Sequence, residues 1–350
     1  MNIDPKIAQI FDKILSGTAP SKDDCRSMLE CGEHTVEAAM IRAVADAMTR
    51  KRFNNEGIIL GQIGIELGAC PANCLFCSFG EDHTEFETHA MSIDEILACS
   101  HRFADSGDLF ALFFMTMHEF DYENLLHTVR TVRERLSHQP QIVINIGDFD
   151  RRQADELRAA GVNGAYHVQR IREGKDSDLD PQERIKTIRV IKEAGLDWYY
   201  CCEPVGPEHS PQELVDQMFL GVEYECFQHA AMRRVYFPTS PLAHHGQISE
   251  LRLAQITAVV ALASMGCAET KNIAVHEPNL IGLTSGANVV YAEAGANPRD
   301  TEEETSEHRG RDIATCKTML YEAGFENLLT ASGEYRSLKQ AYLGEENVVA

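Results

Sequence analysis

Residues 63–79 read IGIELGACPANCLFCSF, an apolar and β-prone run that ends in Cys70, Cys74 and Cys77. The spacing C-x3-C-x2-C falls where a strand is expected to give way to a loop. Three thiolates on one short loop can hold three corners of a cubane iron–sulfur cluster. Because the loop has no fourth cysteine, one iron stays open to a non-protein ligand. The stretch therefore predicts a cluster with one corner available for chemistry.

Two other interpretations of these cysteines are a zinc knuckle and three scattered residues of an apolar core. A structural zinc site needs four ligands, usually as two separated pairs, and the sequence nearby supplies no second pair. Core cysteines would be spaced for packing, without Pro71 and Asn73 in a short loop. We therefore adopt the iron–sulfur interpretation.

Beyond this stretch the chain alternates short apolar, β-rich runs with longer amphipathic ones. Eight expected strands, each followed by an expected helix, are the count of a closed (β/α)8 barrel. We predict an α/β fold, a (β/α)8 TIM barrel over residues 56–325, with a helical N-terminal cap over residues 1–55 and a C-terminal extension over residues 326–350. The expected strands cover residues 59–67, 109–116, 141–147, 164–168, 198–205, 233–238, 271–276 and 287–293.

The composition limits the cellular compartments and the classes of partner that we expect for this protein. The net charge of −22 argues against nucleic acid or an anionic membrane as the main partner, because both would be repelled. The chain has no apolar stretch long enough for a membrane span, and its N-terminus does not read as a signal peptide. Its 11 cysteines follow no disulfide framework. We expect a cytoplasmic, reduced protein, and the sequence leaves the oligomeric state open, a homodimer included.

The cysteine spacing, with Phe76 just before the third cysteine, resembles the signature of the radical S-adenosylmethionine (radical SAM) superfamily. Three further segments resemble its biotin synthase-like branch, which includes biotin synthase, the hydrogenase maturase HydE and methylornithine synthase. These segments are residues 191–216, 233–246 and 283–305. The resemblance covers most of residues 20–325, most strongly at the cysteines.

The resemblance implies a [4Fe–4S] cluster on Cys70, Cys74 and Cys77 and S-adenosylmethionine bound to the open iron. In the superfamily, one electron from the cluster splits S-adenosylmethionine into methionine and a 5′-deoxyadenosyl radical. That radical would abstract hydrogen from a small-molecule substrate, leading to a rearrangement or fragmentation in cofactor or metabolite biosynthesis. A low-potential flavodoxin or ferredoxin would supply the electron.

Candidate site residues follow the expected strands, at the edge where barrel enzymes bind their ligands. Resemblance and position assign contacts with S-adenosylmethionine to Phe76, Thr116, Asn145, Gln169, Arg170 and Glu203. The expected substrate pocket contains Arg234, Tyr236, His276 and Asn297. For Arg234 two interpretations stay open, a salt bridge to a substrate carboxylate and an outward-facing arginine.

The chain also departs from members of the branch. Biotin synthase carries cysteines for a second, [2Fe–2S] cluster on strands two and three, and the corresponding runs LFALFFMT and QIVINIG have none. Biotin formation is therefore disfavoured. HydE and methylornithine synthase carry a strand-four glutamate that binds S-adenosylmethionine, where this chain has Gln169 and Arg170.

Two alternative functions remain. One is sulfur insertion of the lipoyl or biotin synthase type, with a second cluster held by some of Cys25, Cys31, Cys201, Cys202, Cys226, Cys267 and Cys316. The other is a non-catalytic iron–sulfur electron carrier or scaffold. Carriers usually close all four cluster corners with protein ligands, whereas this loop offers three.

Overall fold

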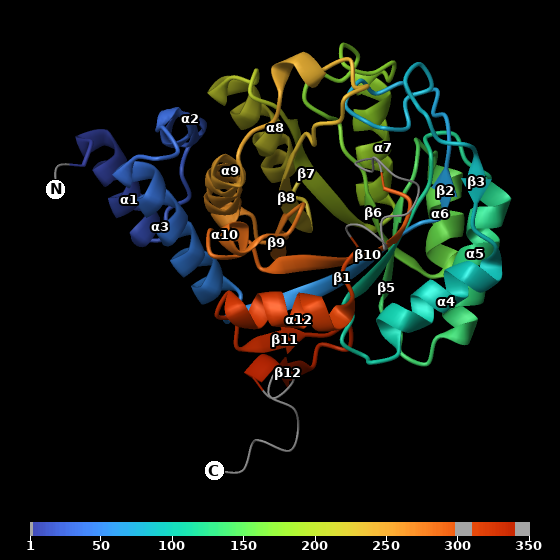
Figure 1. Cartoon of the computed structure of the whole chain (residues 1–350). Coiled ribbons are helices and arrows are strands. Elements are labelled where there is room, and N and C mark those ends of the chain that lie inside the picture. Colours follow the sequence, from blue (N-terminus) through green and yellow to red (C-terminus); the bar gives the residue numbers. More distant parts are fainter. Residues whose placement is uncertain (1–2, 298–309, 340–350) are drawn as a thin grey trace.

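The computed structural model describes residues 3–297 and 310–339, and a closed barrel of parallel strands lies at its centre (Figure 1). Eight strands follow one another around the barrel in chain order, and pairing between the last and the first closes it. This arrangement confirms the predicted (β/α)8 fold. The barrel strands are β1 (Glu56–Gly64), β4 (Ala111–Met115), β5 (Gln141–Asn145), β6 (Val162–Tyr166), β7 (Asp197–Val205), β8 (Gln228–Arg233), β9 (Asn272–Val275) and β10 (Val289–Gly295).

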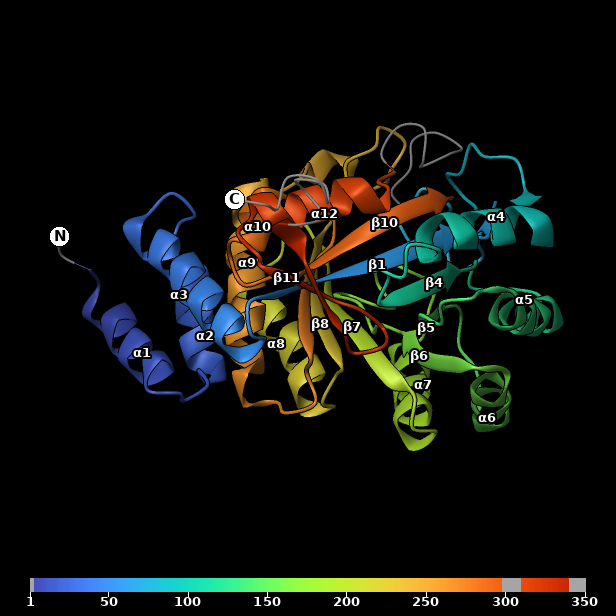
Figure 2. The same cartoon turned by 90° about the horizontal axis from the view of Figure 1, so that it is seen from below.

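Helices surround the barrel and cover its outer face (Figure 2). Several begin with a capping box, in which a side chain such as that of Ser92 or Ser210 accepts from the backbone three residues on. No helix in the described part of the chain is both long and apolar enough to cross a membrane. The helices are α4 (Ile93–Ala104), α5 (Tyr122–Arg135), α6 (Arg151–Ala160), α7 (Pro181–Glu193), α8 (Pro211–Glu223), α9 (Glu250–Ala263), the short α10 (Leu280–Leu283) and α12 (Ile313–Glu322).

The predicted sixth strand is wrong. We expected residues 233–238, but β8 ends at Arg233, and residues 234–238 form the loop that follows it. The misassignment has a physical reason, because Val235, Tyr236 and Phe237 favour strands whereas Ala230 and Ala231 of the real strand do not. Burial of β8 between its neighbours outweighs that local preference.

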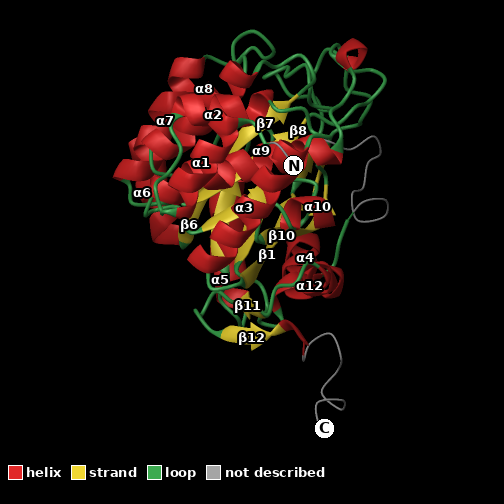
Figure 3. Cartoon of the chain, turned by 90° about the vertical axis from the view of Figure 1, so that its left-hand side faces the viewer, coloured by secondary structure: helices red, strands yellow, loops and turns green. Residues whose placement is uncertain are grey.

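The first residues of the chain are helical, as predicted, and they pack on one flank of the barrel (Figure 3). They form α1 (Pro5–Leu15), α2 (Lys22–Glu30) and α3 (Val36–Arg52), and α2 and α3 lie against α8 and α9. Helix α9 is therefore covered on both sides, and every residue from Leu253 to Ala263 is buried. In this layer the Gln255 side chain donates to the backbone oxygens of Met28 and Cys31, both at 2.9 Å.

A small hairpin near the C-terminus was not expected from the sequence. Strand β11 (Asn327–Leu329) pairs in parallel with the start of β1, and β12 (Tyr335–Ser337) pairs with β11. Part of the segment that we predicted as a C-terminal extension thus continues the barrel sheet. Residues 340–350 of that segment lie outside the described residues.

Histidine 229 on β8 makes the stability of the fold depend on pH. Its ring is fully buried between β8 and α8, Nδ1 lies 2.8 Å from Ser264 Oγ, and burial lowers the pKa of His229 to about 3. The unfolded chain binds a proton below about pH 6.5, whereas the folded chain stays neutral there, so stability is full above pH 6.5 and falls as the pH drops. We expect His229 to remove about 1 kcal/mol of unfolding free energy between pH 7.5 and 5.5.

Urea unfolding of the apoprotein at pH 7.5 and 5.5 measures this loss, with His229→Gln as the non-titrating variant. The pH-dependent loss should be smaller in His229→Gln than in the wild type. An equal loss in both proteins would contradict the assignment to His229.

Candidate active site

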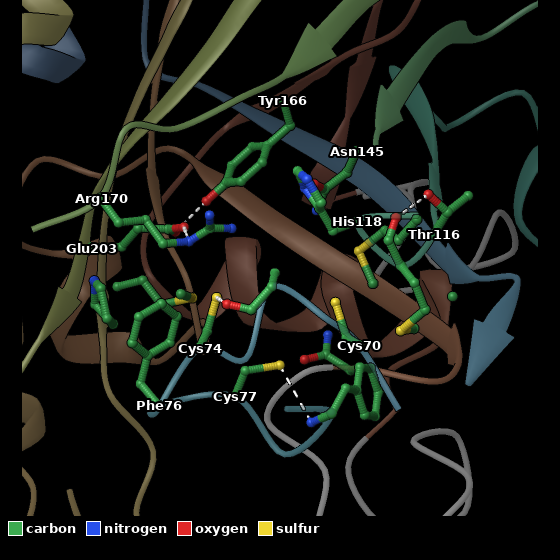
Figure 4. Close-up of a pocket in the computed structure, with 18 of the residues that line it drawn as sticks. Cys70, Cys74, Phe76, Cys77, Thr116, His118, Asn145, Tyr166, Arg170 and Glu203 are labelled. Carbon is green, nitrogen blue, oxygen red and sulfur yellow. Dashed lines mark hydrogen bonds and ion pairs between the residues drawn. The ribbon is translucent and has the colours of Figure 1, made fainter. Parts of the chain in front are cut away.

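A cavity opens at the carboxyl ends of the barrel strands, where barrel enzymes place their sites (Figure 4). Its wall includes the loop after β1, here called the cysteine loop (residues 68–80). The structure brings to this cavity most of the residues that the sequence singled out. They are Cys70, Cys74, Phe76, Cys77, Thr116, Asn145, Arg170, Glu203, Arg234, His276 and Asn297.

The cysteine loop is fixed by hydrogen bonds to itself and to two other loops. The Cys70 backbone N–H donates to the Phe79 oxygen at 2.7 Å, which closes the loop at its base. At its tip, the Leu75 N–H donates to the Asp176 oxygen at 2.9 Å, and Ser240 Oγ donates to the Leu75 oxygen at 2.8 Å. The loop is therefore shaped by the protein before any ligand binds.

The donor set of the loop fits a cubane cluster. All three cysteines are free thiols on the wall of one cavity, and the Phe79 N–H points to Cys77 Sγ at 3.4 Å, a contact that favours a thiolate. Burial raises the pKa of Cys74 to about 12 and also raises that of Cys77, and iron binding would reverse this effect because a metal-bound thiol is deprotonated. In the described residues no three His, Cys, Asp or Glu side chains converge on a single ion. A cubane needs no such convergence, since each thiolate binds a different iron.

A charged network lies beside the cysteine loop. Arg170 Nε lies 3.2 Å from Glu203 Oε1, and the Tyr166 hydroxyl donates to the other oxygen of Glu203. Arg170 also lies over the ring of Phe76, 5.8 Å from its centroid. Burial lowers the pKa of Arg170, but Glu203 and Glu173 outweigh burial and raise it. Arg170 and Glu203 thus form a salt bridge beside the cysteine loop.

A second network joins the segments that follow β5 and β6 to helix α7. Asp148 Oδ1 is 3.1 Å from both His167 Nε2 and Arg184 Nη1, and it accepts from Thr187 Oγ1 at 2.7 Å. Burial raises the pKa of Asp148, but His167 and Arg184 have the larger combined effect and hold it well below its usual range. Of this group, Arg184 reaches the cavity wall.

Arg234 is buried at the cavity wall, so its side chain does not face outward. Its guanidinium group makes a bidentate pair with Glu208, with nitrogen–oxygen distances of 2.5 and 2.9 Å. A substrate carboxylate at Arg234 would therefore compete with Glu208 for the same donors.

Two of the predicted residues do not line the cavity. Tyr236 is 49% exposed because β8 ends at Arg233, so Tyr236 belongs to the outer loop. Gln169 turns back on its own loop, where its side chain donates to the Arg170 oxygen at 2.8 Å. Strand β6 ends at Tyr166, and the turn after it presents Arg170 to the cavity in place of Gln169.

The sequence analysis missed several polar residues of the cavity wall. They are Gln62, Glu66, Tyr166, Arg184 and Arg233. For Gln62 a signal existed, since a glutamine interrupts the apolar run of the first strand. The sequence pattern offers no such signal for Arg184, which reaches the site from helix α7.

Comparisons with known proteins find relatives among the biotin synthases. No protein-family model matches the chain. It is 24% identical to the biotin synthase of Geobacter sulfurreducens over 219 residues, which are 59% of this chain and 64% of that enzyme. It is 23% identical to the biotin synthase of Cenarchaeum symbiosum over 199 residues, 55% of this chain and 61% of that enzyme. The chain thus spans less than two thirds of either relative.

Solved structures resemble the whole barrel. The crystal structure of methylornithine synthase (PylB) has a TM-score of 0.76 at 17% identity and covers 90% of this chain and 96% of its own. The hydrogenase maturase HydG of Carboxydothermus hydrogenoformans has a TM-score of 0.76 at 15% identity and covers 93% of this chain and 80% of its own. At these identities the likeness shows the fold.

A parallel barrel with this three-cysteine loop at its mouth resembles the architecture of radical SAM enzymes. The similarity in sequence to biotin synthases and in fold to methylornithine synthase supports the expected radical SAM, biotin synthase-like resemblance. Members of the radical SAM family use a [4Fe–4S] cluster and S-adenosylmethionine.

Proposed function

We propose that this protein cleaves S-adenosylmethionine reductively and uses the resulting radical on a small molecule inside the barrel. The observation that carries the proposal is that Cys70, Cys74 and Cys77 lie together on the wall of a partly charged cavity at the barrel mouth. When bound, the cluster supplies the electron that splits S-adenosylmethionine, and the 5′-deoxyadenosyl radical abstracts hydrogen from the substrate to start a rearrangement or fragmentation.

The protein's own contribution is to hold the reactants and to exclude water. Thr116 follows β4, Asn145 ends β5, and both line the cavity; they are our candidates for contacts with S-adenosylmethionine. Arg170 lies over Phe76 of the cysteine loop and pairs with Glu203. A closed barrel keeps a carbon radical away from bulk water and its side reactions.

Glu66 adds a negative charge to the S-adenosylmethionine side. It follows β1, and its Oε2 accepts from the Met117 N–H at 3.1 Å. Of the carboxylates on the described cavity wall, Glu203 pairs with an arginine and Glu66 does not. A carboxylate there favours a cationic ligand, and S-adenosylmethionine carries an ammonium and a sulfonium.

We therefore expect Glu66→Gln to raise the KM for S-adenosylmethionine about tenfold, since a hydrogen bond to a charged group contributes about 1.5–3 kcal/mol. Steady-state formation of 5′-deoxyadenosine measures the KM. The exposed carboxylate of Glu81, near the same loop, provides the control, and Glu81→Gln should leave the KM unchanged. An unchanged KM in Glu66→Gln would remove Glu66 from the binding site.

The arrangement of the other cysteines favours one cluster over two. Cys201 lies beside Tyr166 and Glu203 in the barrel, whereas Cys202 points outward, 3.8 Å from the Leu214 oxygen of α8. Alternating strand positions therefore direct these neighbours to opposite faces of β7. This supports rearrangement or fragmentation over sulfur insertion, and iron analysis separates the two.

The proposed electron donor is a low-potential flavodoxin or ferredoxin in the cytoplasm, and a homodimer remains a proposal as well. The test is anaerobic reconstitution with iron and sulfide, followed by dithionite and S-adenosylmethionine. Formation of 5′-deoxyadenosine with about four irons per chain supports the proposal, and more iron supports the sulfur-inserting alternative. A loaded cluster that does not bind S-adenosylmethionine would instead support a non-catalytic carrier.

A further inference from the structure

The positive charges around the cavity are already neutralised by the protein. Every arginine on the described cavity wall lies within salt-bridge distance of a carboxylate of the same chain. The shortest nitrogen–oxygen distances are 3.2 Å for Arg170 and Glu203, 3.1 Å for Arg184 and Asp148, 2.7 Å for Arg233 and Glu277, and 2.5 Å for Arg234 and Glu208.

This pairing bears on which substrates the barrel can accept. An anionic group would have to displace an internal carboxylate from its arginine and leave that carboxylate without its partner, which is strongly unfavourable. Glu66 adds a further negative charge to the same wall. The electrostatics therefore disfavour a substrate whose buried end is a carboxylate or a phosphate.

Gln62 provides a different kind of contact. A Cβ on the preceding Gly61 would lie 2.9 Å from Phe103 of α4, so Gly61 faces the helices, and by alternation Gln62 faces the barrel interior. Gln62 is 5% exposed and lines the cavity. Among the described residues its Oε1 has no hydrogen-bond partner. A buried polar atom without a partner is unfavourable, and a ligand that donates a hydrogen bond to it would remove that penalty.

The cavity is also lined by aromatic and thioether side chains, one of which, Tyr166, donates to Glu203. The ring of His276 stacks on Tyr291 with centroids 4.7 Å apart, and the ring of Tyr166 meets His276 edge-on at 5.6 Å. Met115 and Met232 complete the wall with thioether side chains. A carboxamide in such surroundings can both donate to and accept from an uncharged partner of similar geometry.

We propose that Gln62 determines substrate specificity by pairing with a carboxamide-type group, an open-chain amide or a lactam, at the buried end of the substrate. The inference rests on the proposed function and narrows its substrate class. It also replaces the expectation that Arg234 recognises a substrate carboxylate, because Arg234 is engaged by Glu208.

The experiment compares two probes of equal size, pentanamide and pentanoate. Calorimetry measures their binding to the anaerobically reconstituted protein with S-adenosylmethionine present. We expect pentanamide to bind about tenfold more tightly than pentanoate, and Gln62→Leu to abolish this preference. Gln217→Leu is the matched control, because Gln217 is a buried glutamine outside the cavity, and it should keep the preference.

Tighter or equal binding of pentanoate would overturn the inference, and so would binding of neither probe at millimolar concentration. Persistence of the preference in Gln62→Leu would overturn it as well. Failure of the proposed function has a separate signature, because it appears as absence of 5′-deoxyadenosine in the wild type, with or without probes.

Discussion

Replacing Cys74 with alanine is expected to reduce 5′-deoxyadenosine formation to background, a loss of more than about 100-fold. Substitutions of residues that merely orient a metal ligand typically cost about 10–100-fold, and Cys74 would be a ligand itself. The side chain is buried at the cavity wall. Iron and sulfide content, the absorbance of the cluster and the yield of 5′-deoxyadenosine measure the effect.

Cys202→Ala is the control for this experiment. Cys202 is also a buried cysteine, but it faces α8 and not the cavity. Both variants remove a thiol from a packed site, so a general loss of stability would affect both. We expect Cys202→Ala to keep its cluster and its activity. Full activity in Cys74→Ala, or equal losses in the two variants, would refute the assignment of the cysteine loop as the cluster site.

Replacing Arg170 with leucine is expected to lower the free energy of unfolding by about 3–5 kcal/mol, because Glu203 would stay buried without its counter-charge. The side chain of Glu203 is 2% exposed and that of Arg170 is 19% exposed, so water cannot take over the role of the partner. Chemical unfolding of the apoprotein, followed by circular dichroism, measures the loss.

Arg172, two residues further along the same loop, provides a matched control. It pairs with Glu213 at 2.7 Å, but both side chains reach solvent, and Arg172→Leu should cost less than about 1 kcal/mol. The double variant Arg170→Leu/Glu203→Leu should recover part of the loss, because it removes the unpaired charge. If the double variant were less stable than Arg170→Leu, the buried charge of Glu203 would not be the cause.

The cluster loop and the barrel could be predicted because their signals are local. Cys70, Cys74 and Cys77 lie within one short stretch, and their spacing alone determines that they share a loop. The strands alternate with amphipathic helices along the chain, so their number and order follow from hydrophobic periodicity. Neither inference requires knowing which distant residues meet.

The lining of the cavity could be predicted only in part. Which side chains point into the barrel depends on where each strand ends. A shift of one residue moves each side chain to the opposite face of the strand. Gln169 and Arg170 differ by one position, yet Arg170 reaches the cavity and Gln169 does not. Arg184 enters from a helix, and its approach depends on how α7 packs against the barrel. Such contacts arise from tertiary packing, which single-sequence patterns do not contain.

The position of α9 has a consequence for the order in which the chain acquires its structure. Helices α2 and α3 leave the ribosome early, whereas α9, against which they pack, is synthesised after most of the barrel strands. Until then their apolar faces have no partner, and contacts between such distant segments form slowly because long loops must close first. Helices α2 and α3 are therefore synthesised before α9 and are among the last elements to dock, and until then their apolar faces favour aggregation.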